Sequence, residues 1–429
     1  MKIKRVILII TMAFIALTLR AQESETKSGW SWALMPLSGF DTDVGLGGGG
    51  MFELFDYGDG SYYPTYRHKL HIKYYTTTKG ATKKVFYYDS DYLIPKARVS
   101  FEISNYREQA LEFFGFNGYE AEYNPAYEDD QSEDYISRMY YRYRNNMTRI
   151  KADLQGDIIG RKLRWIGGIN YYAVKTSTVD IDHLNKGKKE ENMLPHVDLL
   201  FDEYVKKGII PEDQKDGGNH TFIKAGISWD TRDFEAHPMS GIWTEFMVMS
   251  APSFLSNTDY SFTTLAFIHR QYIPIIEKKL TVAYRLDYQP TLGDIPFYAM
   301  PIVHGSRITN YGYGGGESIR GIFRNRLLGK DVFYANMELR WLFAKSKIGK
   351  ANMEWGVTTF FDTGRVTKRF DIPDNAPYVA YGKETFHNAY GVGFKFTVNK
   401  NMVVTMDYGM PANKQDGKGG FYIKTTGMF

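Results

Sequence analysis

Hydrophobic and polar residues alternate along much of this chain, and residues 332–344 show the pattern most clearly. One face of this segment is apolar, with Phe333, Ala335, Met337, Leu339, Trp341 and Phe343. The opposite face is polar, with Asn336, Glu338 and Arg340. A period of two residues indicates a β-strand whose two faces meet different surroundings.

The same alternation predicts about sixteen strands along the chain. Their expected bounds are 30–40, 44–56, 65–77, 82–92, 95–106, 135–156, 160–174, 219–230, 240–251, 258–272, 278–290, 331–344, 351–363, 388–398, 401–410 and 420–429. The long connections follow only odd-numbered strands: 107–134, 175–218, 291–330 and 364–387. In an outer-membrane barrel whose termini are both periplasmic, these connections face outward and are free to be long.

Composition separates such a barrel from a β-sandwich. Aromatic residues make up 16% of the chain, with 33 Tyr and 28 Phe, and 24% of the residues are charged. Membrane barrels use both groups, because aromatic girdles mark the membrane interfaces while the lumen is polar. We therefore expect an all-β fold, a 16-stranded antiparallel transmembrane β-barrel. Closure between its first and last strands is required, because lipid cannot satisfy an open sheet edge.

Residues 1–21 have the features of a secretory signal peptide. Three basic residues precede the apolar run Val6–Leu19, which is too short for a membrane-spanning helix. We expect cleavage after Ala21, a single barrel domain over residues 22–429 and a location in the bacterial outer membrane. Four of the 53 Lys and Arg residues lie in the signal, which leaves 49 basic against 49 acidic residues. This balance gives no case for nucleic-acid binding.

Candidate chemistry is sparse. Cysteine is absent, which excludes disulfides, thiol nucleophiles and cysteine-based metal sites. His68 and His71 are three residues apart on an expected strand, so they face opposite sides and cannot share a metal. The other histidines show no ligand spacing, and no Ser–His or carboxylate pair stands out near a strand end. We expect no enzymatic activity, no cofactor and no metal site.

The stretch 314–331, GGGESIRGIFRNRLLGKD, interrupts the alternating segments and lies in the connection 291–330. A loop that long in a compact fold is usually either functional or disordered. Disorder would suit its glycine and charge content. Its apolar residues favour packing instead: Ile319, Ile322, Phe323, Leu327 and Leu328. We expect a long sixth loop that is folded into the barrel lumen.

Three stretches carry a family resemblance. The first is a strand–turn–strand motif, Trp229-Asp230-Thr231-Arg232-Asp233 with Pro238 and Gly241. The second runs from Gly293-Asp294-Ile295-Pro296-Phe297-Tyr298 to Ser318-Ile319-Arg320-Gly321, and the third is Phe360-Phe361-Asp362-Thr363-Gly364. In this order and spacing, the stretches resemble the bacterial surface-antigen superfamily of outer-membrane barrels, which contains BamA and TamA. The resemblance covers roughly residues 220–429.

The resemblance implies that Arg320 of the sixth loop meets Asp362 of the thirteenth strand. Asp362 shares a polar strand face with Glu354 and Thr358, which agrees with a lumenal position. A bidentate guanidinium–carboxylate pair would fix the loop, whereas an unpaired guanidinium there is costly. The family usually has an aromatic residue directly after Arg-Gly. Here Ile322 stands in that place, and we expect Phe323 to supply the aromatic contact. Ser318, Ile319, Gly321 and Gly364 complete the expected site.

The last strand ends the chain on Phe429, which we expect on the same face as Phe421 and Ile423. Pro36 in the first strand removes a ladder donor, which suits a sheet edge. Gly47 and Gly48 belong to a glycine cluster on the second strand, and glycine weakens strands and permits bends. We interpret Pro36, Gly47, Gly48 and Phe429 as features of a weak seam between the first and last strands. A strongly bent second strand is the alternative.

By resemblance, the chain is expected to act in outer-membrane protein assembly or in polypeptide translocation through the seam between strands 1 and 16. The alternative is a passive channel or a structural barrel that keeps the family fold without the activity. Family members that insert or export proteins usually carry periplasmic polypeptide-binding domains, and we expect none here. The expected partners are outer-membrane lipid, and periplasmic accessory proteins or client polypeptides.

The third, fourth and seventh loops are long and polar, so we expect them to be dispensable for folding. In the fourth loop, residues 196–207 predict a short amphipathic helix. This helix either caps the pore mouth or packs on its own loop.

Overall fold

The computed structural model describes residues 26–41, 45–61, 63, 65–235, 237–348, 351–398, 402–424 and 429. The expected signal peptide, residues 1–21, and its cleavage site lie outside these residues. One sheet contains seventeen strands and a second contains two. Two of the seventeen, β11 (Leu280–Gln289) and β12 (Thr291–Gly293), are a single strand interrupted at Pro290. The sheet therefore corresponds to sixteen barrel strands, as the alternation predicts.

The bounds of the strands follow the predicted ranges closely. The other strands of the main sheet are β1 (Trp30–Asp41), β2 (Gly45–Asp56), β3 (His68–Thr77), β4 (Thr82–Ile94), β5 (Ala97–Glu112), β6 (Arg142–Ile159), β7 (Leu163–Ser177), β8 (Gly217–Asp230), β9 (Gly241–Ala251), β10 (Phe262–Ile276), β15 (Asp331–Ile348), β16 (Ala351–Lys368), β17 (His387–Val398), β18 (Met402–Pro411) and β19 (Gly420–Lys424). The second sheet is a hairpin of β13 (Ile302–Val303) and β14 (Asn310–Tyr311).

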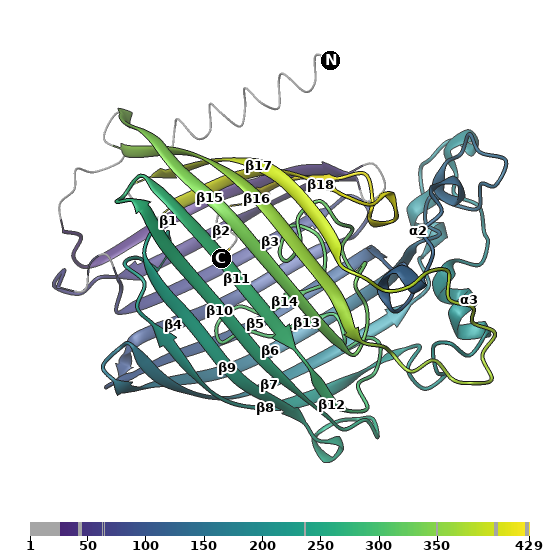
Figure 1. Cartoon of the computed structure of the whole chain (residues 1–429), viewed down its shortest axis with the longest axis horizontal. Coiled ribbons are helices and arrows are strands. Elements are labelled where there is room, and N and C mark those ends of the chain that lie inside the picture. The colour runs from purple at the N-terminus through teal and green to yellow at the C-terminus, as the bar shows by residue number, and fades with distance from the viewer. Residues whose placement is uncertain are drawn as a thin grey trace.

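Each strand of the wall pairs antiparallel with its neighbours in the sequence, from β1 with β2 through to β18 with β19. The inclined strands wrap around a central space (Figure 1). Among the residues that the structure describes, no ladder joins β1 to β19. The long loops gather at one end of the strands, here called the long-loop end, and the short connections lie at the opposite, short-turn end.

Burial along the strands is the reverse of that in a water-soluble sheet. On β6 the buried positions include Arg149, Lys151 and Asp153, whereas Ile150 and Leu154 are exposed on the outer surface. Charged side chains thus point into the lumen and apolar ones point outward. This is the arrangement of a wall that faces lipid.

The sixth strand begins later than its alternation predicts, at Arg142 rather than residue 135. Residues 137–141 form turns, with backbone bonds from Tyr140 N to Ser137 O and from Arg142 N to Met139 O. Met139, Tyr140 and Tyr141 are buried. Their alternation with arginines reflects packing in a loop cluster, which a period of two cannot distinguish from a strand.

Three long loops and part of the sixth form an aromatic cap over the long-loop end: loop 3 (residues 113–141), loop 4 (178–216) and loop 7 (369–386). Phe113 and Phe116 of loop 3 lie 5.6 Å apart between ring centroids, and Phe116 lies 4.3 Å from Phe370 of loop 7. Loop 3 is therefore part of a packed core. Our expectation of a polar, peripheral loop is wrong there, because three closely spaced phenylalanines are fully buried.

Loop 4 carries the helices α2 (Ile181–Asn185) and α3 (Leu200–Lys206), which lie beyond the strand ends (Figure 1). The apolar face of α3 packs on loop 3, since the Tyr204 ring lies 5.5 Å from that of Phe113. The predicted helix is thus shorter than residues 196–207 and contributes to the cap. Short 3-10 turns complete the loops: Gly118–Glu120, Pro125–Glu128, Glu190–Asn192, Ser253–Leu255 and Lys414–Asp416. None of the described helices is long and apolar enough to cross a membrane.

Candidate functional site

Loop 6, residues 294–330, connects β12 to β15 and enters the barrel lumen. It has two parts. The hairpin part consists of β13, β14 and the tip between them, which lie within the ring of strands in Figure 1. The arginine part, residues 314–328, contains the Ser318–Gly321 motif. Sequence reasoning identified only the arginine part, because strands of two residues leave no detectable periodicity.

Arg320 and Asp362 form the predicted ion pair. The Arg320 Nε and Nη2 atoms donate to the two Asp362 carboxylate oxygens at 2.9 and 3.0 Å, and the Arg320 backbone N–H donates to the same group at 2.9 Å. Arg320 is 1% exposed and Asp362 is 0% exposed. The bidentate geometry fixes the orientation of the loop relative to β16.

Two further carboxylates meet the same guanidinium. Arg320 Nη1 lies 2.7 Å from Glu338 of β15 and 3.3 Å from Asp407 of β18. Burial disfavours the charge, but Asp362 and Glu338 outweigh it and hold the pKa of Arg320 above its usual value. Sequence alternation places Glu338 on a polar strand face, but only the curvature of the wall brings three strands onto one side chain. One loop residue thus ties β15, β16 and β18 together.

Glycines allow this close approach. Gly321 has φ +91°, and a Cβ there would lie 2.7 Å from the backbone of Gly409 on β18. A Cβ on Gly364 would lie 2.5 Å from Ile319 Cδ1. Gly364 therefore makes room on β16 for the apolar side of the loop, where Ile319 is fully buried. This explains why a glycine follows the aspartate of the strand motif.

Ser318 shapes the turn that delivers Arg320. Its hydroxyl accepts the Gly314 N–H at 2.7 Å and donates to the Gly314 carbonyl at 2.9 Å. The Ser318 carbonyl accepts from the Asn336 side chain of β15 at 2.7 Å. The serine thus closes the loop on itself and attaches it to the wall.

Phe323 makes aromatic contacts, as predicted, but they lie in the cap. Its ring stacks on Phe114 at 4.7 Å and meets Tyr123 edge-on at 5.0 Å. The aromatic partner of Arg320 is Phe360 on β16, whose ring centroid lies 3.5 Å from the guanidinium carbon. Phe323 therefore connects the arginine part of loop 6 to loop 3.

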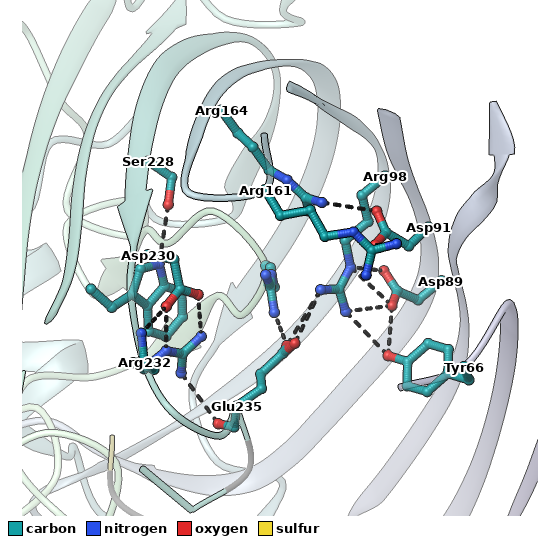
Figure 2. A network of polar contacts seen from close by, with 12 residues as sticks. Tyr66, Asp89, Asp91, Arg98, Arg161, Arg164, Ser228, Asp230, Arg232 and Glu235 are labelled. Carbon is teal, nitrogen blue, oxygen red and sulfur yellow. Dashed lines mark hydrogen bonds and ion pairs between the residues drawn. The ribbon is translucent and has the colours of Figure 1, made fainter. Parts of the chain in front are cut away.

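The strand–turn–strand motif lies at the short-turn end, within the polar network of Figure 2. Arg232 forms a bidentate pair with Asp230 at 2.9 and 2.7 Å, with its guanidinium 4.0 Å from the Trp243 ring centroid. One Asp233 oxygen accepts the backbone N–H groups of Phe234, Met239 and Ser240 at 2.9, 3.0 and 3.2 Å. Hydrogen bonds and an ion pair within the motif thus hold the turn in shape.

Pro238 and Gly241 complete that turn. The Pro238 carbonyl accepts from Arg340 of β15 at 3.3 Å, so this part of the turn reaches into the lumen. Gly241 has φ +100°, and a Cβ there would lie 2.3 Å from the Thr231 carbonyl oxygen. The glycine is required by the tight start of β9.

The same network joins the turn to strand β5 and to loop 6. Arg98 donates to Asp89 at 2.6 and 2.8 Å and lies 3.3 Å from Glu235. Glu235 also pairs with Arg307, at the tip of the loop 6 hairpin. In Figure 2, Glu235 points toward Arg98 from the opposite side of the network. This connection was not predicted from the sequence.

The glycine cluster on β2 has a packing explanation. Gly47 and Gly48 pair with Gly39 and Ser38 of β1. A Cβ on Gly47 would overlap the ring of Tyr75 on β3, whereas Gly48 has no heavy atom within 4 Å of that position. Gly47 thus serves the β2–β3 contact. Pro36 faces outward on β1 and pairs with Gly50.

We predicted that Phe429 lies on the same face as Phe421 and Ile423, and this prediction is wrong. Phe421 and Ile423 are exposed, but the Phe429 ring lies 4.9 Å from the Arg340 guanidinium carbon and 5.3 Å from that of Arg285. Both arginines are buried on the lumenal side, and Arg340 Nη2 donates to the Phe429 carbonyl at 3.2 Å. Cation–π contacts hold the terminal ring there.

The described residues contain no cluster of three or more His, Asp or Glu side chains arranged to hold a metal ion. Several lumenal carboxylates are paired with arginines or lysines, as at Arg320 and at Lys224, whose Nζ lies 3.1 Å from Asp153. The candidate site is thus a set of ion pairs between loop 6 and the wall.

Comparison with known proteins agrees with this geometry. A family model described as the Omp85 superfamily domain matches residues 64–429. The structure is similar to BamA from Haemophilus ducreyi lacking POTRA domains 1-3, with 13% identity, a TM-score of 0.54 and coverage of 92% of this chain and 70% of that chain. It is also similar to CdiB from Escherichia coli, with 10% identity, a TM-score of 0.56 and coverage of 93% and 62%. A comparison with curated proteins finds no match.

Proposed function

This chain belongs to the Omp85 superfamily, and from that premise we propose that it acts in the bacterial outer membrane in protein assembly or polypeptide translocation. The path that we propose is the wall of the barrel at the seam between β1 and β19. The chain spans less than two thirds of the CdiB chain that it resembles, so this activity is proposed from the barrel alone. We propose no enzymatic activity and no cofactor.

The observation that carries the proposal is the occupied lumen. Two parts of loop 6 lie in it, and Arg320 holds one of them through three carboxylates. The aromatic cap lies over the long-loop end, with Phe114 and Phe116 fully buried. A passive channel, the alternative expected from the sequence, needs an open lumen. A filled lumen favours an activity of the wall.

The seam is the part of the wall best suited to that activity. Over the described residues β1 pairs only with β2, and β19 pairs only with β18, from Gly409↔Gly420 to Thr405↔Lys424. Pro36 cannot donate a backbone hydrogen bond. Unpaired strand edges are templates for another strand. The partners that we propose are outer-membrane lipid, and client polypeptides or periplasmic accessory proteins.

In-cell crosslinking tests the proposal. A photoreactive residue replaces Leu34, on the outer face of β1, or Ile150, on the outer face of β6 far from the seam. We expect polypeptide adducts from position 34 and only lipid adducts from position 150. Equal adducts from both positions, or none from position 34, would contradict a seam activity and favour a structural barrel.

A further inference from the structure

The tip of the loop 6 hairpin, Gly305–Thr309, is held differently from the rest of the loop. It contacts the wall mainly through backbone carbonyls. Lys224 Nζ donates to Gly305 O and Ser306 O at 3.2 and 2.9 Å, and Arg149 Nη1 donates to Thr309 O at 2.7 Å. Water is able to replace donors of this kind. Behind the tip, Val303 of β13 lies in the same apolar cluster as Ile319, Ile322 and Leu327 of the arginine part, so these segments are held against the wall by apolar contacts.

The side chains at the hairpin tip are poorly satisfied. Three buried polar atoms have no hydrogen-bond partner: His304 Nδ1, Ser306 Oγ and Arg307 Nε. Ile308 is 68% exposed beside them. Buried polar groups in native proteins are usually paired, so a run of unpaired atoms needs an explanation. The arginine part also has two such atoms, Asn325 Oδ1 and Arg326 Nε, so the tip is distinguished by having its unpaired atoms close together beside the exposed Ile308.

The charge balance at the tip is also unfavourable. Arg307 lies among like charges, and burial, followed by the guanidiniums of Arg98 and Arg232, lowers the pKa of Arg307 to about 9. Arg98 and Arg232 have their own partners in Asp89 and Asp230. Asp89 and Asp230 favour the Arg307 charge from farther away, and the carboxylate in direct contact with Arg307 is Glu235, whose side chain is 47% exposed. By contrast, Arg320 has three carboxylates, and all of them are buried.

We propose that the tip of the loop 6 hairpin is a releasable plug, latched at the short-turn mouth by the Arg307–Glu235 ion pair, and that it opens while Arg320 stays in place. The tip moves, whereas β13, β14 and the arginine part stay fixed. Because Glu235 is reached by solvent, added salt weakens the latch, whereas the buried Arg320 cluster is screened much less. The Arg307–Glu235 latch does not depend on the proposed function, because it controls the lumen and not the seam.

Conductance of the folded protein in planar lipid bilayers tests the latch. Glu235→Gln removes the carboxylate charge with little change in shape, and Arg98 keeps its pair with Asp89. We expect openings to become about tenfold more frequent than in the unsubstituted protein. The matched control is Glu277→Gln, an exposed carboxylate on another short turn, which should behave like the unsubstituted protein. Equal opening by Glu235→Gln and Glu277→Gln would overturn the proposal.

Crosslinking supplies the reverse experiment. The chain has no cysteine, so Glu235→Cys with Arg307→Cys introduces the only two thiols. Before treatment this double variant should open as often as Glu235→Gln. After bridging by a short bismaleimide it should return to the closed level. Continued opening of the bridged protein would show that the hairpin is not the gate.

Hydrogen exchange tests the unsubstituted protein, so its result does not depend on whether a variant folds. Backbone amides of residues 305–309 should exchange faster as salt is raised. Those of residues 318–322 should stay protected under the same conditions. Equal protection and equal salt response in the two parts of loop 6 would also overturn the proposal.

Discussion

At the scale of single residues, Arg320 organises the lumen. The sequence contains enough information to predict its pair with Asp362, because both residues lie in recognisable motifs and the polar strand face indicates the lumen. Glu338 and Asp407 were not predicted as partners, since their meeting depends on how β15, β16 and β18 curve around the loop. Because Arg320 has more partners than Asp362, substitutions of the two residues should differ in their effect on stability.

Removing Arg320 should destabilise the barrel more than removing Asp362. Arg320→Ala leaves Asp362 without its cation and removes a cation from Asp407 and Glu338, although Glu338 keeps Arg340 at 2.7 Å. Loss of one partner of a buried pair typically costs about 3–5 kcal/mol. Asp362→Ala leaves the guanidinium with Glu338 and Asp407, so the loss should be smaller. The double variant should lose much less than the sum, as measured by urea unfolding of the folded barrel. Additive losses would contradict this coupling. Arg320→Lys should rescue poorly, because lysine lacks the planar fork.

Gly364→Ala should destabilise the barrel through steric overlap. The added methyl group would lie 2.5 Å from Ile319 Cδ1, its shortest contact, and 3.0 and 3.1 Å from Phe333 O and Leu327 Cδ2. Overpacking of this kind costs about 1–3 kcal/mol. Ile319→Val removes that Cδ1 atom, so the pair Gly364→Ala and Ile319→Val should be more stable than Gly364→Ala alone. Urea unfolding of the four proteins measures the coupling, and a double variant weaker than both single variants would contradict the steric account.

At the scale of elements, alternation predicted the wall well because every strand has one lipid face and one lumenal face. The alternation gave wrong bounds where buried side chains of a loop repeat every second residue, as they do in a strand. Residues 137–141 alternate because the cap buries their aromatic side chains, and the strand begins only at Arg142. The hairpin of β13 and β14 was missed because it is too short to repeat any pattern. Phe429 was misplaced because the arginines that hold it come from distant strands.

Pro36→Val should strengthen the first strand. Valine restores a backbone donor and favours a strand, so the stability gain is expected at about 0.5–1.5 kcal/mol, the contribution of one hydrogen bond. The temperature at which the folded band is lost on gels measures this gain. If the seam is active, crosslinking to polypeptides from position 34 should fall at the same time. Higher stability with unchanged crosslinking would show that the strength of the seam does not control the activity.

The cap and the tip of loop 4 should respond differently to change. Deletion of residues 187–192, which are exposed or half-buried, should leave the heat-modifiable band unchanged. Phe116→Ala should destabilise the folded protein by about 3–5 kcal/mol, because a fully buried aromatic ring is removed. Urea unfolding compares the two. A large loss from the deletion would show that the tip of loop 4 packs structurally.

At the scale of the whole molecule, loops enter or cover the barrel from both ends. Loop 6 occupies the lumen, and the loops around Phe113 and Phe116 cover the long-loop end. The turn bearing Asp230 and Pro238 reaches into the opposite end and contacts Arg340. The fold and the arginine–aspartate anchor were accessible from the sequence. The packing of loops at the two ends was not, because it arises from contacts between loops that are far apart in the chain.

Loop 6 lies across the lumen, so we expect no open path through it and place the proposed activity at the wall. The most direct test is the conductance of the unsubstituted protein in a planar bilayer at about 0.15 M salt, where surface ion pairs are only partly screened. We predict a closed baseline with brief openings. A steady, ohmic pore of the size expected for an empty lumen would contradict the account and support a passive channel.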